Sequence, residues 1–131
     1  MNTSAESHPL RTGAILRVLD LHLVDYLVVG GVAANAYGAS RLTQDLDCVV
    51  DQRRGNLVRL AEALQDLGAR LRVEGMTDEE SAALGIRPDA VALERMRIST
   101  WRTDEGDFDV LVELPAAGGR LAAIKTYCRV R

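Results

Sequence analysis

The chain of 131 residues is predicted to fold as one α/β domain with a small mixed sheet and flanking helices. The length fits a single domain with a real core. Two short apolar runs, 26–30 and 42–50, alternate with segments whose apolar residues have helical spacing. Two more strand-like runs, 95–103 and 107–114, flank Asp-Glu-Gly, which predicts a hairpin with a three-residue loop and a left-handed Gly106. Together these elements indicate a partly antiparallel sheet covered by helices.

The N-terminal part begins with a predicted disordered arm, 1–8, and the single domain is expected to cover 9–131. Pro9 suits the start of a helix. The apolar stripe of this helix comprises Ile15, Leu16, Leu19 and Leu23. The run 26–30 ends in glycine and is predicted as a buried strand, and the small-residue segment 31–38 as a short helix.

The clearest helical pattern follows the second strand. Asn56 is predicted to cap this helix and Gly68 to end it. Its apolar stripe comprises Leu57, Leu60, Leu64 and Leu67. Further along, 69–75 is a candidate strand, and 77–85 is predicted as a short helix capped by its first or second residue. The segment 119–128 is predicted as a final helix.

Composition predicts a cytoplasmic protein without a membrane partner. The net charge is −3, and no apolar run approaches the ~20 residues that span a bilayer. The N-terminus lacks the apolar core of a signal peptide. The two cysteines, Cys48 and Cys128, form neither a disulfide framework nor a metal-binding CxxC pair.

Two aspartates one residue apart, Asp45 and Asp47, interrupt the apolar run 42–50. Side chains at i and i+2 of a strand share a face, with Cα atoms ~6.6 Å apart, so the two carboxylates repel each other unless a cation lies between them. Oxygen ligands without histidine or thiolate favour Mg²⁺ or Mn²⁺. The alternative is a strand near the sheet edge with two solvated acids. The apolar flanks favour an interior strand and hence a metal site.

The later strand offers a third carboxylate that would complete a two-metal site. Asp107 and Asp109 share one face of this strand, and Phe108 lies on the other. Asp109 is the expected ligand because it lies deeper in the strand, whereas Asp107 borders the turn and is expected to be solvated. The alternative is that Asp109 is a structural acid of the hairpin and does not bind a metal.

The glycine pair Gly30 and Gly31 stands between a predicted strand and a predicted helix. Backbone N–H groups at a helix N-terminus form an anion site, and glycine lets a phosphate approach closely. Residues 32–44 suffice for a short helix and a return into a neighbouring strand, so the glycines and the aspartates would face one another. The alternative is a tight turn that only requires a positive φ.

This arrangement resembles the nucleotidyltransferase superfamily related to DNA polymerase β. The stretches "GGVAANAYGASRLTQDLD" and "GDFDVLVELP" are similar to bacterial nucleotidyltransferases of the AbiEii or MenT toxin type, and the resemblance covers residues 24–127. It implies the nucleotidyltransferase core and a transfer of a nucleotidyl group from an NTP, with two Mg²⁺ or Mn²⁺ ions and release of pyrophosphate. The acceptor would be a hydroxyl of tRNA or of a protein, and a partner antitoxin would restrain the enzyme.

Five residues carry the core of this resemblance. Asp45 and Asp47 match the metal-binding pair of the family, and Asp109 matches its third carboxylate. Gly30 and Gly31 match the phosphate-binding turn, where most polymerase-like members carry Gly-Ser. A serine hydroxyl contact is therefore lost, and the backbone cradle remains.

Three further residues match positions near the family's site. Arg41 and Thr43 match a segment beside the metal pair, and Lys125 matches a helical lysine near the triphosphate. An ordinary ion pair is the alternative for Arg41, and a solvated helix position is the alternative for Lys125. Any RNA contact of this acidic chain would be local, through Arg53-Arg54 or Arg70-Arg72.

A second function is left open by the C-terminus. Similar proteins continue beyond the matched lysine with a further helical segment, whereas this sequence stops six residues after Lys125. The alternative function is therefore a non-catalytic nucleotide-binding module, or a regulatory, dimerising module of the same fold. A homodimer is compatible with either function.

Overall fold

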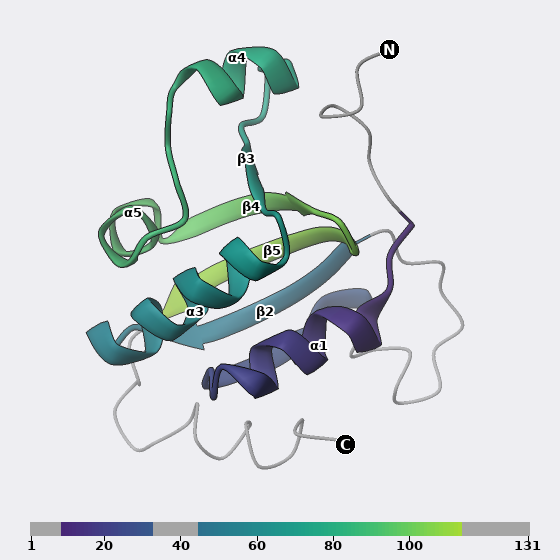
Figure 1. Ribbon diagram of the computed structural model, residues 1–131, viewed down its shortest axis with the longest axis vertical. Helices are drawn as coiled ribbons and strands as arrows, with labels where there is room; N and C mark the ends of the chain where they lie inside the picture. Colours follow the sequence, from purple (N-terminus) through teal and green to yellow (C-terminus); the bar gives the residue numbers. More distant parts are fainter. Residues whose placement is uncertain (1–8, 33–44, 114–131) are drawn as a thin grey trace.

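The computed structural model describes residues 9–32 and 45–113, which form a layer of strands with helices packed against it (Figure 1). The elements are α1 (Thr12–Leu21), β1 (Tyr26–Val29), β2 (Asp45–Asp51), α3 (Arg54–Asp66), β3 (Arg70–Arg72), α4 (Asp78–Ala83), α5 (Ala90–Met96), β4 (Ile98–Thr103) and β5 (Gly106–Glu113). The predicted arm 1–8, most of the predicted helix 31–38 and the predicted helix 119–128 lie outside the described residues. Within the two described ranges, every helix is too short or too polar to cross a membrane.

The strands form one five-stranded mixed sheet in the order β1-β2-β5-β4-β3. β2 runs antiparallel to β1 and parallel to β5, while β4 runs antiparallel to both β5 and β3. The prediction of a mixed α/β fold with flanking helices is therefore confirmed. β2 lies between β1 and β5, so Asp45 and Asp47 are on an interior strand and not on an edge strand.

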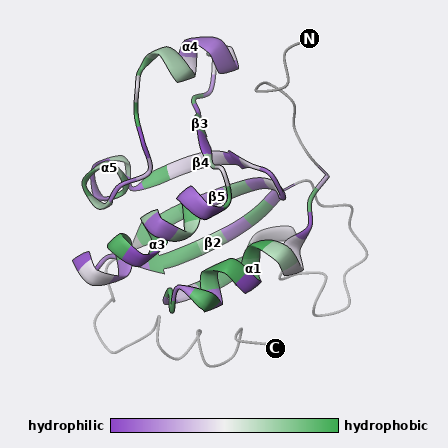
Figure 2. Cartoon of the chain, in the orientation of Figure 1, coloured by the Kyte–Doolittle hydropathy of each residue, from purple (hydrophilic) through white to green (hydrophobic). Residues whose placement is uncertain are grey.

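One face of the sheet carries the hydrophobic core and is covered by α1 and α3 (Figure 1). Strand alternation sends Leu46, Cys48 and Val50 of β2 to this face, where all three are buried. The largest fully buried side chains include Trp101, Phe108, Ile15, Leu19, Leu57, Leu60, Leu64 and Leu93. Figure 2 shows apolar colouring along β2, β5 and α1. Each such burial contributes about 1.5–3 kcal/mol, so this packing fixes the strands that carry the acids.

The prediction for α3 is confirmed for its stripe and for its C-terminal end. The four leucines of the stripe are all buried: Leu57, Leu60, Leu64 and Leu67. Gly68 has a φ of 65°, and its N–H donates to Gln65 O at 3.1 Å, while the N–H of Ala69 donates to Leu64 O at 3.0 Å. This pair of bonds is a Schellman motif, which glycine permits because it has no Cβ.

The predicted role of Asn56 as a helix cap is wrong. α3 begins at Arg54, so Asn56 lies in its first turn and is only 2% exposed. Its Oδ1 accepts from Asp25 N at 2.6 Å, and its Nδ2 donates to Asp25 O at 3.0 Å and to Asp51 O at 2.9 Å. The amide can satisfy these three backbone groups because it carries both donors and acceptors. Asn56 therefore ties α3 to the entry of β1 and the end of β2.

Two other details of the prediction are also wrong. Leu23 follows α1, has a φ of 60° and is 73% exposed, so it does not belong to the buried stripe. Arg95 and Met96 lie in α5 and not in a strand, and this helix is absent from the prediction. Asp89 begins α5 by accepting from Ala92 N at 2.7 Å. Aspartate is a favoured N-cap residue, so this position carries a local signal for the helix.

The short helix α4 starts as predicted. Thr77 is its N-cap: Thr77 Oγ1 accepts from Glu80 N at 3.0 Å, and Thr77 N donates to Glu80 Oε1 at 2.8 Å. These two bonds form a capping box. Arg102 of β4 then fixes the helix to the sheet, because its Nη1 donates to Asp78 Oδ2 at 2.8 Å.

The hairpin between β4 and β5 has a two-residue loop instead of the predicted three. Thr103 pairs with Gly106, which leaves Asp104 and Glu105 in the turn. Because a slip of one residue would turn every side chain to the other face, the loop length decides which residues share the core. The observed register places Trp101 opposite Phe108, and both are fully buried. Gly106 has the predicted positive φ, at 111°.

Candidate metal centre

The parallel pairing of β2 with β5 brings three aspartates together, and we call Asp45, Asp47 and Asp109 the acidic triad. Asp47 lies opposite Asp109, and Asp45 lies opposite Asp107, on the face of the sheet away from the core. One carboxylate oxygen from each residue of the triad lies within 4.8 Å of the others. All three residues are half-buried. They are therefore positioned to hold a metal ion.

The electrostatics of the triad favour a bound cation. Burial raises the pKa of Asp45 above its ordinary value, and the neighbouring Asp109 raises it further. Burial also raises the pKa of Asp109, as does the neighbouring Asp47, and a hydrogen bond with the Thr100 side chain partly offsets the rise. Both shifts reflect negative charge that is poorly solvated and close to more negative charge. A divalent cation between the carboxylates would remove this repulsion.

One oxygen of the triad has no partner. Asp109 Oδ1 is buried and accepts no hydrogen bond within the described part of the chain. Buried acceptors are nearly always paired, because an unpaired one costs about 1–3 kcal/mol. The set of donors is entirely carboxylate oxygen, which fits Mg²⁺ or Mn²⁺. Cys48 points into the core with 1% exposure, and burial raises the pKa of its thiol, so it is not a ligand.

The glycine turn lies directly beside the triad. Val29, the last residue of β1, pairs with Asp47, and Gly30 follows it with a φ of 73°. A Cβ on Gly30 would overlap the Asp47 carboxylate, so only glycine fits. Residues 30–32 are helical, and Gly31 is half-buried. Gly30 therefore lies against Asp47. It also has the positive φ that the alternative interpretation, a tight turn, requires.

A cavity of about 350 Å³ opens next to the triad, and we call it the acid cavity. Its lining comprises Asp45, Arg72, Val73, Glu74, Gly75, Met76, Thr100, Asp107 and Asp109. Four of these residues are acids and one is an arginine, so the cavity is electrostatically suited to a cation. Its volume is at the lower end of the range for small-molecule sites.

The prediction that Asp107 is solvated is wrong. Its side chain is only 18% exposed and lies between two arginines: Asp107 Oδ2 is 3.6 Å from Arg72 Nη1, and Asp107 Oδ1 is 3.7 Å from Arg102 Nε. These contacts offset the charge of Asp107, which therefore adds less repulsion to the neighbouring triad than a free carboxylate would. They also hold Arg72 at the rim of the acid cavity.

Thr100 and Arg102 are not among the site residues predicted from the sequence, and Arg72 is predicted only as an RNA contact. Thr100 lies opposite Asp109 on β4, and Arg102 lies opposite Asp107. Alternation around the apolar Trp101 is a signal for them, because it places both neighbours of Trp101 on the face that carries the acids. The signal becomes usable only when the register of the hairpin is known.

The remaining predicted site residues fall into two groups. Arg41, Thr43 and Lys125 lie outside the described residues. The basic pair Arg53-Arg54 contacts acids, with Arg53 Nη2 at 3.0 Å from Asp51 Oδ2 and Arg54 Nη2 at 3.2 Å from Glu94 Oε1. The pair Arg70-Arg72 lies on the same side of β3, at the outer end of the strand order.

Comparisons with protein-family models, with curated proteins and with solved structures found no match for the chain. The chemistry of the site therefore has to be inferred from its own residues. These are three converging carboxylates, a glycine turn against one of them and a cavity against the other two. This set has the donors for a divalent cation and the space for a ligand that the cation would hold.

Proposed function

We propose that the protein is a divalent-metal-dependent nucleotidyltransferase that moves a nucleotidyl group from an NTP to a hydroxyl acceptor. The observation that carries the proposal is the convergence of Asp45, Asp47 and Asp109 from two parallel strands to within 4.8 Å. The position of Gly30 against Asp47 supports it, because a backbone turn for phosphate would then adjoin the metal ligands. The preferred cation is Mg²⁺ or Mn²⁺.

The residues of the site have separate roles in this proposal. Asp45, Asp47 and Asp109 would hold the cations, which when bound neutralise charge on the phosphates and on the attacking oxygen. The backbone at Gly30 and Gly31 would orient the phosphate chain. Catalysis would then come mainly from positioning and from charge neutralisation.

In this proposal Asp109 would also accept the proton of the acceptor hydroxyl. Its Oδ1 accepts no hydrogen bond within the described residues, so this atom has a lone pair available for a proton. In the reaction, the acceptor oxygen forms a bond to the α-phosphorus and the bond from that phosphorus to pyrophosphate breaks. The proton of the hydroxyl passes to the Asp109 carboxylate.

The acceptor and the partner follow from the family resemblance alone. They are a hydroxyl of tRNA or of a protein as the acceptor, and an antitoxin as the restraining partner. Both belong to the proposal. A transfer assay addresses the acceptor, because the labelled product identifies it.

A transfer assay tests this proposal. The protein is incubated with Mg²⁺ or Mn²⁺, each of the four α-³²P-labelled NTPs, and total bacterial RNA or protein. We expect label in one acceptor with wild-type protein and none with Asp45→Asn/Asp47→Asn. Glu62→Gln on α3 is the matched control, because Glu62 is an exposed acid remote from the triad, and it should transfer normally.

One outcome would count against transfer, and a binding measurement would then identify the remaining function. Equal blank lanes for wild type and for the double variant would contradict an enzyme. If NTP binding measured by thermal shift were nonetheless metal-dependent and lost in the double variant, the result would instead support the non-catalytic nucleotide-binding module.

A further inference from the structure

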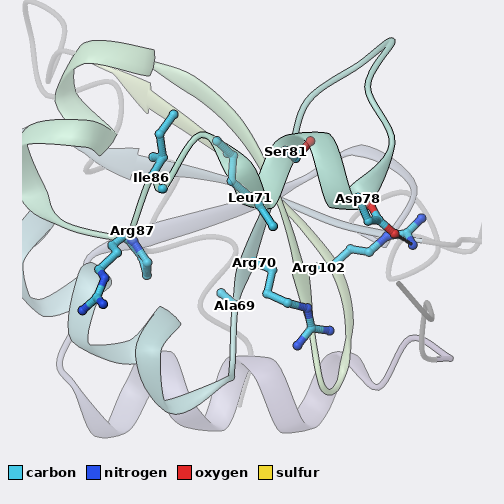
Figure 3. Close-up of a pocket in the computed structure, with 11 residues that line it drawn as sticks. Ala69, Arg70, Leu71, Asp78, Ser81, Ile86, Arg87 and Arg102 are labelled. Carbon is cyan, nitrogen blue, oxygen red and sulfur yellow. Dashed lines mark hydrogen bonds and ion pairs between the residues drawn. The ribbon is translucent and has the colours of Figure 1, made fainter. Parts of the chain in front are cut away.

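A second cavity, of about 300 Å³, lies at the β3 edge of the sheet, next to α4 and the loop 84–88 (Figure 3). We call it the edge cavity. From its lining we propose that it binds a small organic anion, with a phosphate or carboxylate head and an apolar body. The proposal is independent of nucleotidyl transfer, because the acidic triad does not line this cavity.

The charged lining of the edge cavity is basic. Among the described residues, three arginines line it, Arg70, Arg87 and Arg102, together with a single acid, Asp78. Arg102 is already neutralised, since its Nη1 lies 2.8 Å from Asp78 Oδ2 and its Nε lies 3.7 Å from Asp107 Oδ1. Arg70 and Arg87 are left to attract an anion, on a chain whose net charge is −3. The excess of positive charge is therefore local to this cavity.

Arg70 and Arg87 have donors to spare. Arg70 Nε is buried without a hydrogen-bond partner in the described part of the chain. Arg70 Nη1 donates to Gly68 O at 3.2 Å and is 3.9 Å from the exposed Asp104 Oδ1. Arg87 is exposed and pairs with no acid among the described residues. A buried, unpaired guanidinium nitrogen is costly, and an oxyanion would satisfy it.

The rest of the lining is apolar except for Ser81, whose Oγ accepts from Val73 N at 3.2 Å. Leu71 is 9% exposed, Pro88 is buried, and Ala82 and Ile86 complete an apolar wall. In Figure 3 the side chains of Arg70 and Arg87 extend below Leu71 and Ile86. A ligand without an oxygen acceptor would leave Arg70 Nε unsatisfied, and a charged acceptor forms the stronger hydrogen bond with a guanidinium. Inorganic phosphate would leave the apolar wall exposed to water. An anion with an attached ring or short chain matches both parts, and the volume limits its size.

The edge cavity is separate from the acid cavity. Arg102 lines the edge cavity and Asp107 lines the acid cavity, so the contact between these two residues forms the partition. A ligand in the edge cavity therefore needs no metal. This difference allows the two sites to be tested apart.

In the test, the full chain in metal-free buffer is titrated with phenyl phosphate, benzoate and inorganic phosphate. Binding is monitored by ¹H–¹⁵N spectra and by calorimetry. We expect saturable binding of phenyl phosphate and benzoate, at least tenfold tighter than inorganic phosphate, with shifts at the amides of 69–71 and 82–87. Arg70→Gln and Arg87→Gln should each weaken phenyl phosphate about tenfold. Arg95→Gln is the matched control, because Arg95 lines the neighbouring hollow beyond the loop and does not line the edge cavity, and it should bind as wild type.

Further variants separate charge from space. Ala82→Trp fills the edge cavity and keeps the arginines. This variant should show a cooperative thermal unfolding transition, which shows that it is folded, but should no longer bind phenyl phosphate. Asp45→Asn/Asp47→Asn should bind normally. The proposal is overturned by absence of saturation, by equal affinity for phosphate and phenyl phosphate, by unchanged binding in Ala82→Trp, or by loss of binding in Arg95→Gln or in the aspartate variant.

Discussion

Asp47 on β2 and Asp109 on β5 occupy paired positions on neighbouring parallel strands. Their proximity is therefore fixed by the backbone ladder and not by flexible side chains. Because β2 is interior and β5 is held in the hairpin with β4, both carboxylates rest on rigid elements. Sites built on strands of the scaffold hold their geometry more closely than sites on loops.

Removing one acid should stabilise the metal-free protein and abolish its response to metal. Asp109→Asn removes a half-buried negative charge beside two others, so we expect a gain of about 1 kcal/mol without metal. Wild-type protein at a hundredfold excess of Mg²⁺ over its Kd should gain ~2.7 kcal/mol, and the variant should gain almost nothing. Thermal unfolding with and without Mg²⁺ measures both effects. An equal rise in Tm for the two proteins would contradict the assignment of Asp109 as a ligand.

The contribution of Asp45 and Asp109 to the stability of the metal-free protein should fall as the pH rises out of the acid range. The pKa values of Asp45 and Asp109 are raised above the ordinary value of 3.8, so the folded state holds more protons than the unfolded state just above this pH. The contribution of these groups is fully present below about pH 3.8 and is lost as the pH rises through their folded pKa values.

Urea unfolding at a series of pH values, for wild type and for Asp45→Asn/Asp109→Asn, measures this loss. The free energy of unfolding of the variant minus that of the wild type should grow from pH 3.8 towards neutrality, and saturating Mg²⁺ should reverse the trend. Parallel pH curves for the two proteins would show that the pKa values of these carboxyl groups do not differ between the folded and the unfolded state.

A methyl group at Gly30 should disturb the site. Gly30→Ala places a Cβ on the Asp47 carboxylate and forces alanine to a φ of 73°, so we expect a loss of about 1–3 kcal/mol and weaker metal binding. Gly13→Ala is the matched control: Gly13 lies in α1 with nothing within 4 Å of an added Cβ, and the change should stabilise by about 0.5–1 kcal/mol. If Gly30→Ala matched the wild type in stability and in Mg²⁺ response, the close packing of the turn against Asp47 would be refuted.

Truncating the buried amide on α3 should destabilise the whole sheet. Asn56→Ala leaves Asp25 N, Asp25 O and Asp51 O without their side-chain partner, which should cost about 2–3 kcal/mol. Val58→Ala, at a 42% exposed position of the same helix, should change stability by less than about 0.5 kcal/mol. Denaturant unfolding compares the two. A similar small effect for both would mean that Asn56 does not tie the helix to β1 and β2.

Features with a local cause could be predicted from the sequence. The leucine stripe of α3 follows from helical spacing, and the left-handed Gly68 follows from the end of that stripe. The shared face of Asp45 and Asp47 follows from strand alternation, and their interior position follows from the apolar flanks.

Features that depend on pairing could not be predicted in the same way. The environment of Asp107 depends on Arg72, which comes from β3, a strand that reaches β5 only through β4. The hairpin register depends on the burial of Trp101 against Phe108, because the turn sequence also allows a longer loop. Asn56 fits a cap by residue type, but the burial of α3 against β1 and β2 gives it three tertiary bonds instead.

The measurement that tests the central claim most directly is a titration of the full chain with Mn²⁺, followed by the electron paramagnetic resonance signal of the free ion. If the acidic triad is a metal centre, wild-type protein should remove Mn²⁺ from solution with saturation, and Mg²⁺ should compete. Asp47→Asn/Asp109→Asn should remove almost none, while the surface variant Glu62→Gln should bind as wild type. Equal and unsaturable loss of signal for all three proteins would contradict a metal centre on β2 and β5.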